Sequence, residues 1–169
     1  MSKTADQNFN ERVLGKKIRI LFVCHGNICR SPMAEFVMKD LVARAGLASR
    51  FVIESAATSS EEIGNDIHYG TRRILDLHHI PYDSRRARRL IASESEVWDL
   101  LIGMDEANVR NMRKVFGAKA EDKIHKLLEF AGKAGDVADP WYTGDFETTY
   151  EDVSDGCVGL LNFCRYGQR

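Results

Sequence analysis

The sequence predicts a single-domain α/β protein, a three-layer α/β/α structure around a four-stranded parallel sheet of Rossmann-like topology. Two observations predict this fold. Short apolar segments rich in branched residues alternate with segments in which apolar residues recur at helical spacing. In addition, no repeat, linker or low-complexity tract divides the 169 residues, a length typical of one domain.

The first half of the chain predicts two strands and two helices. Residues 18–23 form a branched apolar run that ends near a glycine, as buried strands do. Pro32 suits the first turn of a helix, where its missing N–H would be unpaired anyway, and helical spacing continues to Gly46. A second strand is expected at residues 51–56 and a second helix at residues 66–79, which Pro81 ends.

The second half repeats this alternation. The third strand is expected at residues 97–104. Asp105 then predicts a helix to about residue 116, because its carboxylate can accept hydrogen bonds from the free N–H groups of the first turn. The segment of residues 123–130 is interpreted as the fourth strand with a short continuation. A last helix is expected over residues 149–164.

Composition excludes several classes of function. The formal net charge is −1 and the sequence pI about 6.5, which argues against a nucleic-acid-binding protein. No apolar run approaches the roughly 20 residues of a membrane span, and the first fifteen residues lack the apolar core of a signal peptide. We therefore expect a cytoplasmic protein, by default a monomer, with residues 1–16 as a flexible leader and residues 17–169 as the domain.

Cysteine spacing predicts neither a disulfide framework nor a zinc site. The four cysteines are Cys24, Cys29, Cys157 and Cys164, with no CxxC pair and no histidines at ligand spacing from a cysteine pair. In a cytosolic chain such cysteines are expected to be thiols, and a close pair is expected to be catalytic or redox-active. We expect no metal and no cofactor.

The segment after the first strand has the features of a phosphate-binding loop. Cys24 follows the strand directly, and the loop from His25 to Arg30 leads into the helix. Such a loop can turn its backbone N–H groups inward, beside a helix N-terminus that favours an anion. Gly26 permits a left-handed or strained backbone, and Asn27 tolerates one better than most residues.

Cys24 and Arg30 are the reactive pair that this loop predicts. Inward N–H groups and a nearby cation stabilise a thiolate, so we expect Cys24 to be ionised at neutral pH. Arg30 lies six positions further on, where a curled loop can bring its guanidinium over the same cavity to bind two phosphoryl oxygens. The Ser31 hydroxyl is placed to donate a hydrogen bond to the sulfur.

The run Cys24-His25-Gly26-Asn27-Ile28-Cys29-Arg30-Ser31-Pro32 resembles the signature of the low-molecular-weight protein tyrosine phosphatases. The resemblance extends from about residue 18 to residue 165 and includes a second motif, Ala138-Asp139-Pro140-Trp141-Tyr142. Breaking a phosphate ester requires a proton for the leaving oxygen, and a carboxylic acid that faces the cysteine can supply it. The resemblance identifies Asp139 as this general acid.

The resemblance implies a role for each residue of the site. Cys24, Arg30 and Asp139 would be catalytic, and Cys24 would form a phosphocysteine intermediate that Asp139 helps water to hydrolyse, without a metal. Asp105 would help to fix the loop. The remaining substrate-binding residues would be His25, Gly26, Asn27, Ile28, Cys29, Ser31, Glu61, Trp141 and Tyr142. In the family, a cysteine at the position of Cys29 can also trap an oxidised nucleophile as a disulfide.

Three positions depart from the family pattern. Glu61 stands where an aromatic residue usually stacks on the substrate tyrosine, and its charge would repel an anion. Arg85 replaces a histidine of the network that supports the loop asparagine. Trp141 replaces the first of two tyrosines. The arginines at 85, 86, 88 and 89 form either a solvated face or a basic rim that attracts phosphorylated substrates.

The expected function is therefore hydrolysis of phosphotyrosine in a protein substrate, with a tyrosine kinase as one candidate substrate. Protein-arginine phosphatases are the nearest alternative, but they favour a small polar residue at the position of Ile28. Arsenate reductases on this scaffold relay electrons through cysteines in the middle of the chain, and here none lies between residues 30 and 156. A non-catalytic phosphotyrosine-binding module is a further alternative, although such proteins typically lose the nucleophile or the acid.

Overall fold

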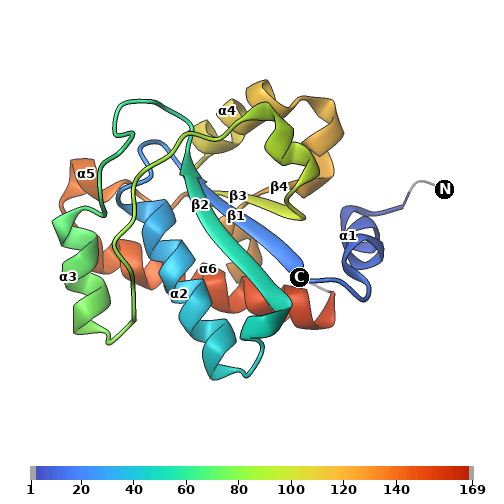
Figure 1. Ribbon diagram of the computed structural model, residues 1–169, viewed down its shortest axis with the longest axis horizontal. Helices are drawn as coiled ribbons and strands as arrows, with labels where there is room; N and C mark the ends of the chain where they lie inside the picture. The colour runs from blue at the N-terminus through green and yellow to red at the C-terminus, as the bar shows by residue number, and fades with distance from the viewer. Residues whose placement is uncertain (1–2, 168–169) are drawn as a thin grey trace.

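The computed structural model describes residues 3–167, which form one α/β unit around a parallel sheet (Figure 1). The strands are β1 (Ile18–Cys24), β2 (Phe51–Ala57), β3 (Leu100–Gly103) and β4 (Ile124–Lys126). They lie in the order β2-β1-β3-β4, and all three pairings are parallel. The predicted four-stranded parallel sheet is confirmed.

Helices surround this sheet on both faces (Figure 1). The α-helices are α1 (Ala5–Val13), α2 (Arg30–Arg44), α3 (Tyr69–Leu77), α4 (Glu106–Phe116), α5 (Pro140–Thr143) and α6 (Phe146–Tyr166). Four short 3-10 helices lie between these elements within residues 3–167: η1 (Ala48–Arg50), η2 (Ala92–Glu96), η3 (Ala118–Lys123) and η4 (Leu127–Ala131). Among residues 3–167, no helix is both long and apolar enough to cross a membrane.

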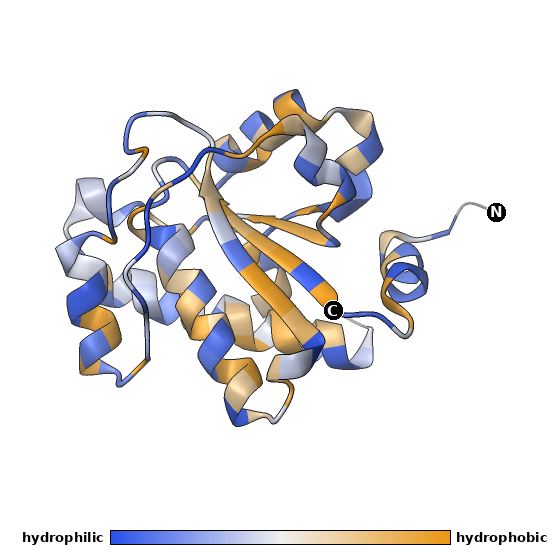
Figure 2. Cartoon of the chain, viewed as in Figure 1, coloured by the Kyte–Doolittle hydropathy of each residue, from blue (hydrophilic) through white to orange (hydrophobic). Residues whose placement is uncertain are grey.

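Strand β1 is the centre of the core, and its side chains alternate between the two faces of the sheet. Ile20 and Phe22 pack into the larger apolar cluster, which α2, α3 and α6 cover. Leu21 and Val23 pack into a second cluster on the opposite face, which includes residues of α4. Burial on both faces explains the continuous apolar run of residues 20–24, whereas Arg19 near the start of the strand is only partly buried and appears as a blue segment in Figure 2.

Most differences from the expected boundaries have a local cause. Helix α3 begins at Tyr69 rather than residue 66, because the His68 side chain accepts a hydrogen bond from the N–H of Gly70 at 3.0 Å. Helix α6 begins earlier than expected, at Phe146, since Asp145 caps it through the N–H of Thr148. Asp105 caps α4 as predicted, through the N–H of Asn108 at 2.8 Å.

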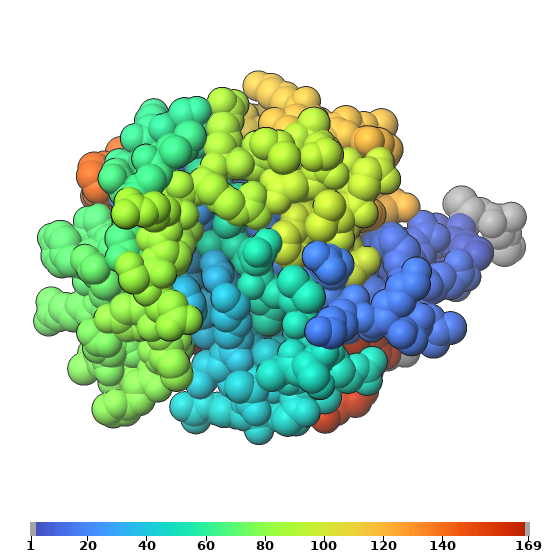
Figure 3. Space-filling view, in the orientation of Figure 1, coloured from blue at the N-terminus to red at the C-terminus, as the bar shows by residue number. Residues whose placement is uncertain are grey.

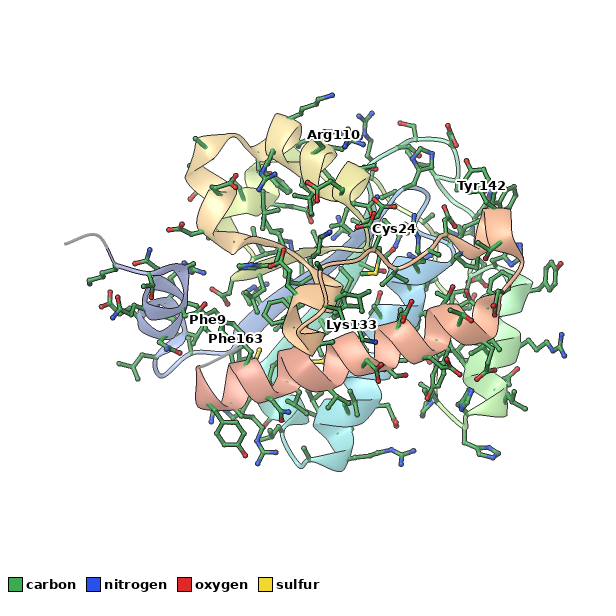
Figure 4. The ribbon with its side chains drawn as sticks, turned by 180° about the vertical axis from the view of Figure 1, so that it is seen from behind. Phe9, Cys24, Arg110, Lys133, Tyr142 and Phe163 are labelled. Atoms are coloured by element: carbon green, nitrogen blue, oxygen red, sulfur yellow. The ribbon has the colours of Figure 1, made fainter. Side chains whose placement is uncertain are left out.

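The amino-terminal segment differs from the flexible leader that was expected over residues 1–16. Residues 5–13 form helix α1, whose first turn is closed by a reciprocal pair of hydrogen bonds between Thr4 and Gln7. Phe9 is 1% exposed, and its ring centroid lies 4.8 Å from that of Phe163 on α6 (Figure 4). Residues 1–2, and 168–169 at the other end of the expected domain, lie outside the described part of the chain.

Candidate active site

The loop between β1 and α2 wraps around the sulfur of Cys24. The N–H of Asn27 donates to Cys24 Sγ at 3.3 Å, and Ser31 Oγ lies 3.0 Å from the same sulfur. Because Ser31 Oγ already accepts a hydrogen bond from Asn27 Nδ2 at 2.8 Å, its own proton is free to point at the sulfur. The buried thiol of Cys24 therefore lies at the centre of converging donors, at the carboxyl end of the central strand.

The backbone of this loop takes its left-handed turn at Asn27, where φ is 59°. Gly26, the other residue expected to supply such a conformation, is not among the residues with positive φ. Its missing side chain serves a different purpose, since a Cβ there would lie 3.2 Å from Cγ of Glu62. The left-handed turn at Asn27 agrees with the prediction, whereas the conformational reason predicted for Gly26 is wrong.

Arg30 is buried and held from two directions. One terminal nitrogen, Nη1, donates to Asp105 Oδ2 at 2.6 Å and to the carbonyl of Val137 at 3.0 Å, while Nη2 donates to Asp139 Oδ2 at 3.2 Å. Burial opposes the charge of this guanidinium. The negative charges of Cys24, Asp105 and Asp139 nevertheless hold the pKa of Arg30 above its ordinary value. Arg30 is therefore a fixed cation beside the sulfur.

Asp139 reaches the same place from a loop more than a hundred residues away in sequence. Its Oδ1 accepts a hydrogen bond from the N–H of Trp141 at 3.1 Å, which caps the short helix α5. Pro140 occupies the first position of that helix, as its fixed φ favours. With Oδ1 engaged by the cap and Oδ2 facing Arg30, the carboxyl group has one orientation.

These three residues line one pocket of about 100 Å³. Its other walls are formed by the loop, by the segment that carries Glu61, and by α5; they comprise His25, Gly26, Ile28, Cys29, Glu61, Glu62, Trp141 and Tyr142. Trp141 and Tyr142 are 58% and 83% exposed, and Figure 4 shows Tyr142 on α5, apart from Cys24. The pocket thus has a charged, buried floor and a partly aromatic, exposed rim.

The rim is acidic, as the sequence indicated at Glu61, where the family usually carries an aromatic ring. Glu61 Oε2 lies 2.9 Å from His25 Nε2, and Glu62 accepts a hydrogen bond from Asn65 Nδ2 at 2.6 Å. Glu62 was not predicted as a site residue, because an acidic residue in a loop carries no distinguishing pattern. On the opposite side, the Trp141 ring meets His68 edge to face, with centroids 5.7 Å apart.

Arg85, Asp105, Asn27 and Ser31 lie behind the pocket rather than in its lining. Arg85 donates to the backbone carbonyl of Asn27 at 2.6 Å and also to its side-chain oxygen. This fixes the amide so that its nitrogen faces Ser31. Burial lowers the pKa of the Arg85 guanidinium, an effect that nearby negative charges including Glu35 partly oppose.

Two members of this network were not predicted. Asn27 Nδ2 also donates to Ser55 Oγ at 2.9 Å, and the Ser55 hydroxyl donates to Glu35 Oε1 at 2.6 Å. Ser55 lies in β2 directly opposite Phe22 of β1, so sheet register brings it to the loop. That register depends on tertiary structure and is not readable from a serine in an apolar run.

Cys29, the second cysteine of the loop, lies in an environment that disfavours its thiolate. Burial, followed by the neighbouring charges of Cys24 and Asp139, raises the pKa of Cys29 to about 12. Cys29 is therefore a neutral thiol at physiological pH. Within residues 3–167, no three His, Cys, Asp or Glu side chains gather as ligands for a metal ion.

Comparison with known proteins identifies the family. Residues 19–166 match the family model described as low molecular weight phosphotyrosine protein phosphatase. A Bacillus subtilis protein named low molecular weight protein-tyrosine-phosphatase YfkJ is 40% identical over 146 residues, which cover 85% of this chain and 94% of that protein. A Staphylococcus aureus relative, PtpA, is 35% identical over 147 residues, 86% of this chain and 93% of that protein.

Solved structures agree with this result. The crystal structure of YfkJ superposes with a TM-score of 0.88 at 38% identity, covering 92% of this chain and 99% of that one. A Drosophila protein described as an arginine phosphatase superposes with a TM-score of 0.79 at 26% identity, covering 88% and 98%. The match spans the sheet, the loop of residues 25–30 and the Asp139 segment, and the chain belongs to the low molecular weight phosphotyrosine protein phosphatase family.

Proposed function

We propose that this protein is a protein tyrosine phosphatase, which hydrolyses phosphotyrosine and small aryl phosphates through a phosphocysteine intermediate at Cys24. The observation that carries the proposal is the meeting of Cys24, Arg30 and Asp139 in one pocket, with backbone and hydroxyl donors aimed at the sulfur. The names of the curated relatives support the same reaction class.

Substrate binding would begin with an exchange of partners at Arg30. In this structure Nη2 contacts Asp139 Oδ2, while Nη1 is held by Asp105 and Val137. A phosphoryl group that enters the pocket competes with Asp139 for Nη2, because its oxygens suit the planar donor fork. The anion then beside Asp139 favours the protonated carboxyl, the form that a general acid needs.

The chemistry proceeds in two displacements. Cys24 Sγ attacks phosphorus, the S–P bond forms as the P–O bond breaks, and Asp139 gives its proton to the departing phenolate oxygen. A water molecule then attacks the phosphocysteine and passes its proton to the Asp139 carboxylate, releasing phosphate and the thiolate. Arg30 and the loop N–H groups stabilise the charge on the equatorial oxygens in both steps.

Leaving-group dependence tests the role of Asp139. Replacing it with Asn keeps the cap on Trp141 but removes the proton, so turnover of phenyl phosphate should fall by about 10²–10⁴-fold. p-Nitrophenyl phosphate, whose leaving group needs less help, should lose much less. An equal loss for both esters would show that Asp139 is not the general acid.

Arginine phosphatase activity is the second candidate, and the acidic rim favours it. Glu61 and Glu62 line the pocket, where they would attract a phosphorylated guanidinium more than a neutral phenyl ring. Ile28, however, offers an apolar contact that suits an aromatic ring better. Turnover of phosphotyrosine, phosphoarginine and arsenate by the wild type, with Cys24→Ser as the control, separates the two candidates from arsenate reduction and from simple binding.

The remaining expectations stay predictions. They are a tyrosine kinase as the substrate protein, a monomer, a cytoplasmic location and a redox role for the Cys24–Cys29 pair. Of the described cysteines, these two line the pocket, whereas Cys157 is fully buried in α6.

A further inference from the structure

The arginine-rich segment of residues 85–89 divides into side chains that point inward and side chains that point outward. Arg85 binds Asn27 beneath the loop, and Arg88 pairs with Glu94 at 2.8 Å and with Glu54 at 3.7 Å. Arg86 and Arg89 are exposed. The inward pair is paired within the fold, whereas the outward pair faces solvent.

Arg86 and Arg89 each donate a hydrogen bond to one end of the segment of residues 60–64, which carries the acidic rim. Arg89 Nη1 donates to Ser60 Oγ at 3.1 Å, and Arg86 Nη1 donates to the carbonyl of Gly64 at 3.0 Å. Between these contacts lie Glu61 and Glu62, which line the pocket. In the space-filling view of Figure 3 the chain regions around residues 58–64 and 84–91 adjoin on the face turned to the viewer.

Neither outward arginine is neutralised by the protein. Among the described residues, no carboxylate pairs with Arg86 or Arg89, although two carboxylates stand between their contact points. Glu61 pairs instead with His25, and Glu62 with Asn65. Each guanidinium has five N–H donors, and one contact leaves the others available to an incoming carboxylate or phosphate.

We propose that Arg86 and Arg89 form a docking surface for acidic residues that flank the phosphotyrosine of a protein substrate. This inference rests on the proposed function and adds a preference of the enzyme for the amino acids around the phosphotyrosine. Consecutive Cα atoms lie about 3.8 Å apart, and Ser60 adjoins a pocket-lining residue. A substrate chain that leaves the pocket over residues 60–64 would therefore pass the two guanidinium groups within a few residues.

The acidic and the basic residues around the pocket are expected to select different parts of the substrate sequence. Glu61 and Glu62 at the pocket mouth disfavour acidic groups immediately beside the phosphorylated side chain, while Arg86 and Arg89 attract them further along the chain. The expected substrate carries Asp or Glu two or more positions from the phosphotyrosine. Free phosphotyrosine and p-nitrophenyl phosphate carry no flanking residues that could contact the arginines.

Matched phosphopeptides test the docking surface. The pair would be identical except for two Asp or two Asn residues two to four positions from the phosphotyrosine. We expect the wild type to favour the Asp peptide roughly three- to tenfold in kcat/KM at low salt, and less at high salt. In the variant Arg86→Gln/Arg89→Gln this ratio should fall to about one, and Arg86→Lys/Arg89→Lys should restore part of it.

A control variant keeps the same change in net charge. Arg50→Gln/Arg165→Gln removes two exposed arginines that line a different pocket, beside the amino ends of β1 and β2. It should retain the wild-type preference. A wild-type ratio near one, a ratio unchanged in Arg86→Gln/Arg89→Gln, or an equal loss in the control variant would overturn the proposal.

A binding measurement separates this proposal from the proposed function. Affinities of the Asp and Asn phosphopeptides for the Cys24→Ser variant, measured by fluorescence anisotropy, require no turnover. Failure of the wild type to hydrolyse p-nitrophenyl phosphate would contradict the phosphatase proposal alone. Equal affinities for the two peptides would contradict the docking surface even if hydrolysis is efficient.

Discussion

Substitution of Asn27 tests how the loop is held together. Its φ of 59° costs an alanine about 1–2 kcal/mol, whereas glycine adopts the same conformation without strain. Both substitutions also remove the amide that joins Ser31, Ser55 and Arg85, and a buried group left without its partner costs about 1–3 kcal/mol. Glycine adds a further 0.5–1 kcal/mol, roughly, by loosening the unfolded chain.

These magnitudes predict an order of stability. Taking about 2 kcal/mol for the lost hydrogen bonds, Asn27→Gly should cost about 2.5–3 kcal/mol and Asn27→Ala about 3–4 kcal/mol of unfolding free energy. Urea unfolding measures both, with exposed Asn162→Ala on α6 as a control expected within about 0.5 kcal/mol of the wild type. Alkylation of Cys24 by iodoacetamide should also slow in both variants, since Ser31 loses the donor that orients it.

Two results would refute this reasoning. If Asn27→Ala is as stable as Asn27→Gly or more so, the left-handed backbone does not strain the folded state. If both variants lie within about 0.5 kcal/mol of the wild type, the buried network does not stabilise the loop.

Three further predictions concern the rest of the molecule. Phe9→Ala should lower the unfolding free energy by about 3–4 kcal/mol, because the ring is fully buried against α6; a loss below about 1 kcal/mol would show that α1 is only loosely attached. Gly159→Ala should cost about 3 kcal/mol or more, since its Cβ would lie 1.9 Å from the carbonyl oxygen of Phe130; a Tm equal to the wild type would contradict this close approach. Burial raises the pKa of the Cys157 thiol above its ordinary value of 9.0, so the thiol ionises in the unfolded chain at a lower pH than in the folded protein. The free energy of unfolding should therefore keep its full value well below pH 9.0 and fall as the pH rises above it. Chemical unfolding at a series of pH values should show a shallower fall in Cys157→Ala, and an identical fall would contradict the assignment.

The fold was largely predictable because its signals are local. Continuous apolar runs predict strands buried on both faces, and Pro32 and Asp105 predict the starts of two helices that the structure contains. Helix α1 was missed, although Thr4 and Gln7 form a capping pair, because a single apolar residue, Phe9, carries its burial. Its packing against Phe163 depends on a partner more than 150 residues away.

The residues of the site also divide into those that the local sequence predicts and those that it does not. Cys24, Arg30 and Ser31 are close in sequence, so loop and helix geometry constrain them together. Asp139 could be placed only through the family resemblance, because no local pattern relates it to residue 30. Ser55 and Glu62 come to the loop through sheet register and loop packing, which leave no trace in the sequence itself.

Rapid quenching during turnover tests the central claim most directly. Wild-type protein mixed with phenyl phosphate, quenched within the first turnover and digested, should carry covalent phosphate on the peptide that contains Cys24, and at no other residue. Cys24→Ser should carry none and release no phenol above background. Phosphate on another side chain, or turnover that survives Cys24→Ser undiminished, would contradict the assignment of Cys24 as the nucleophile.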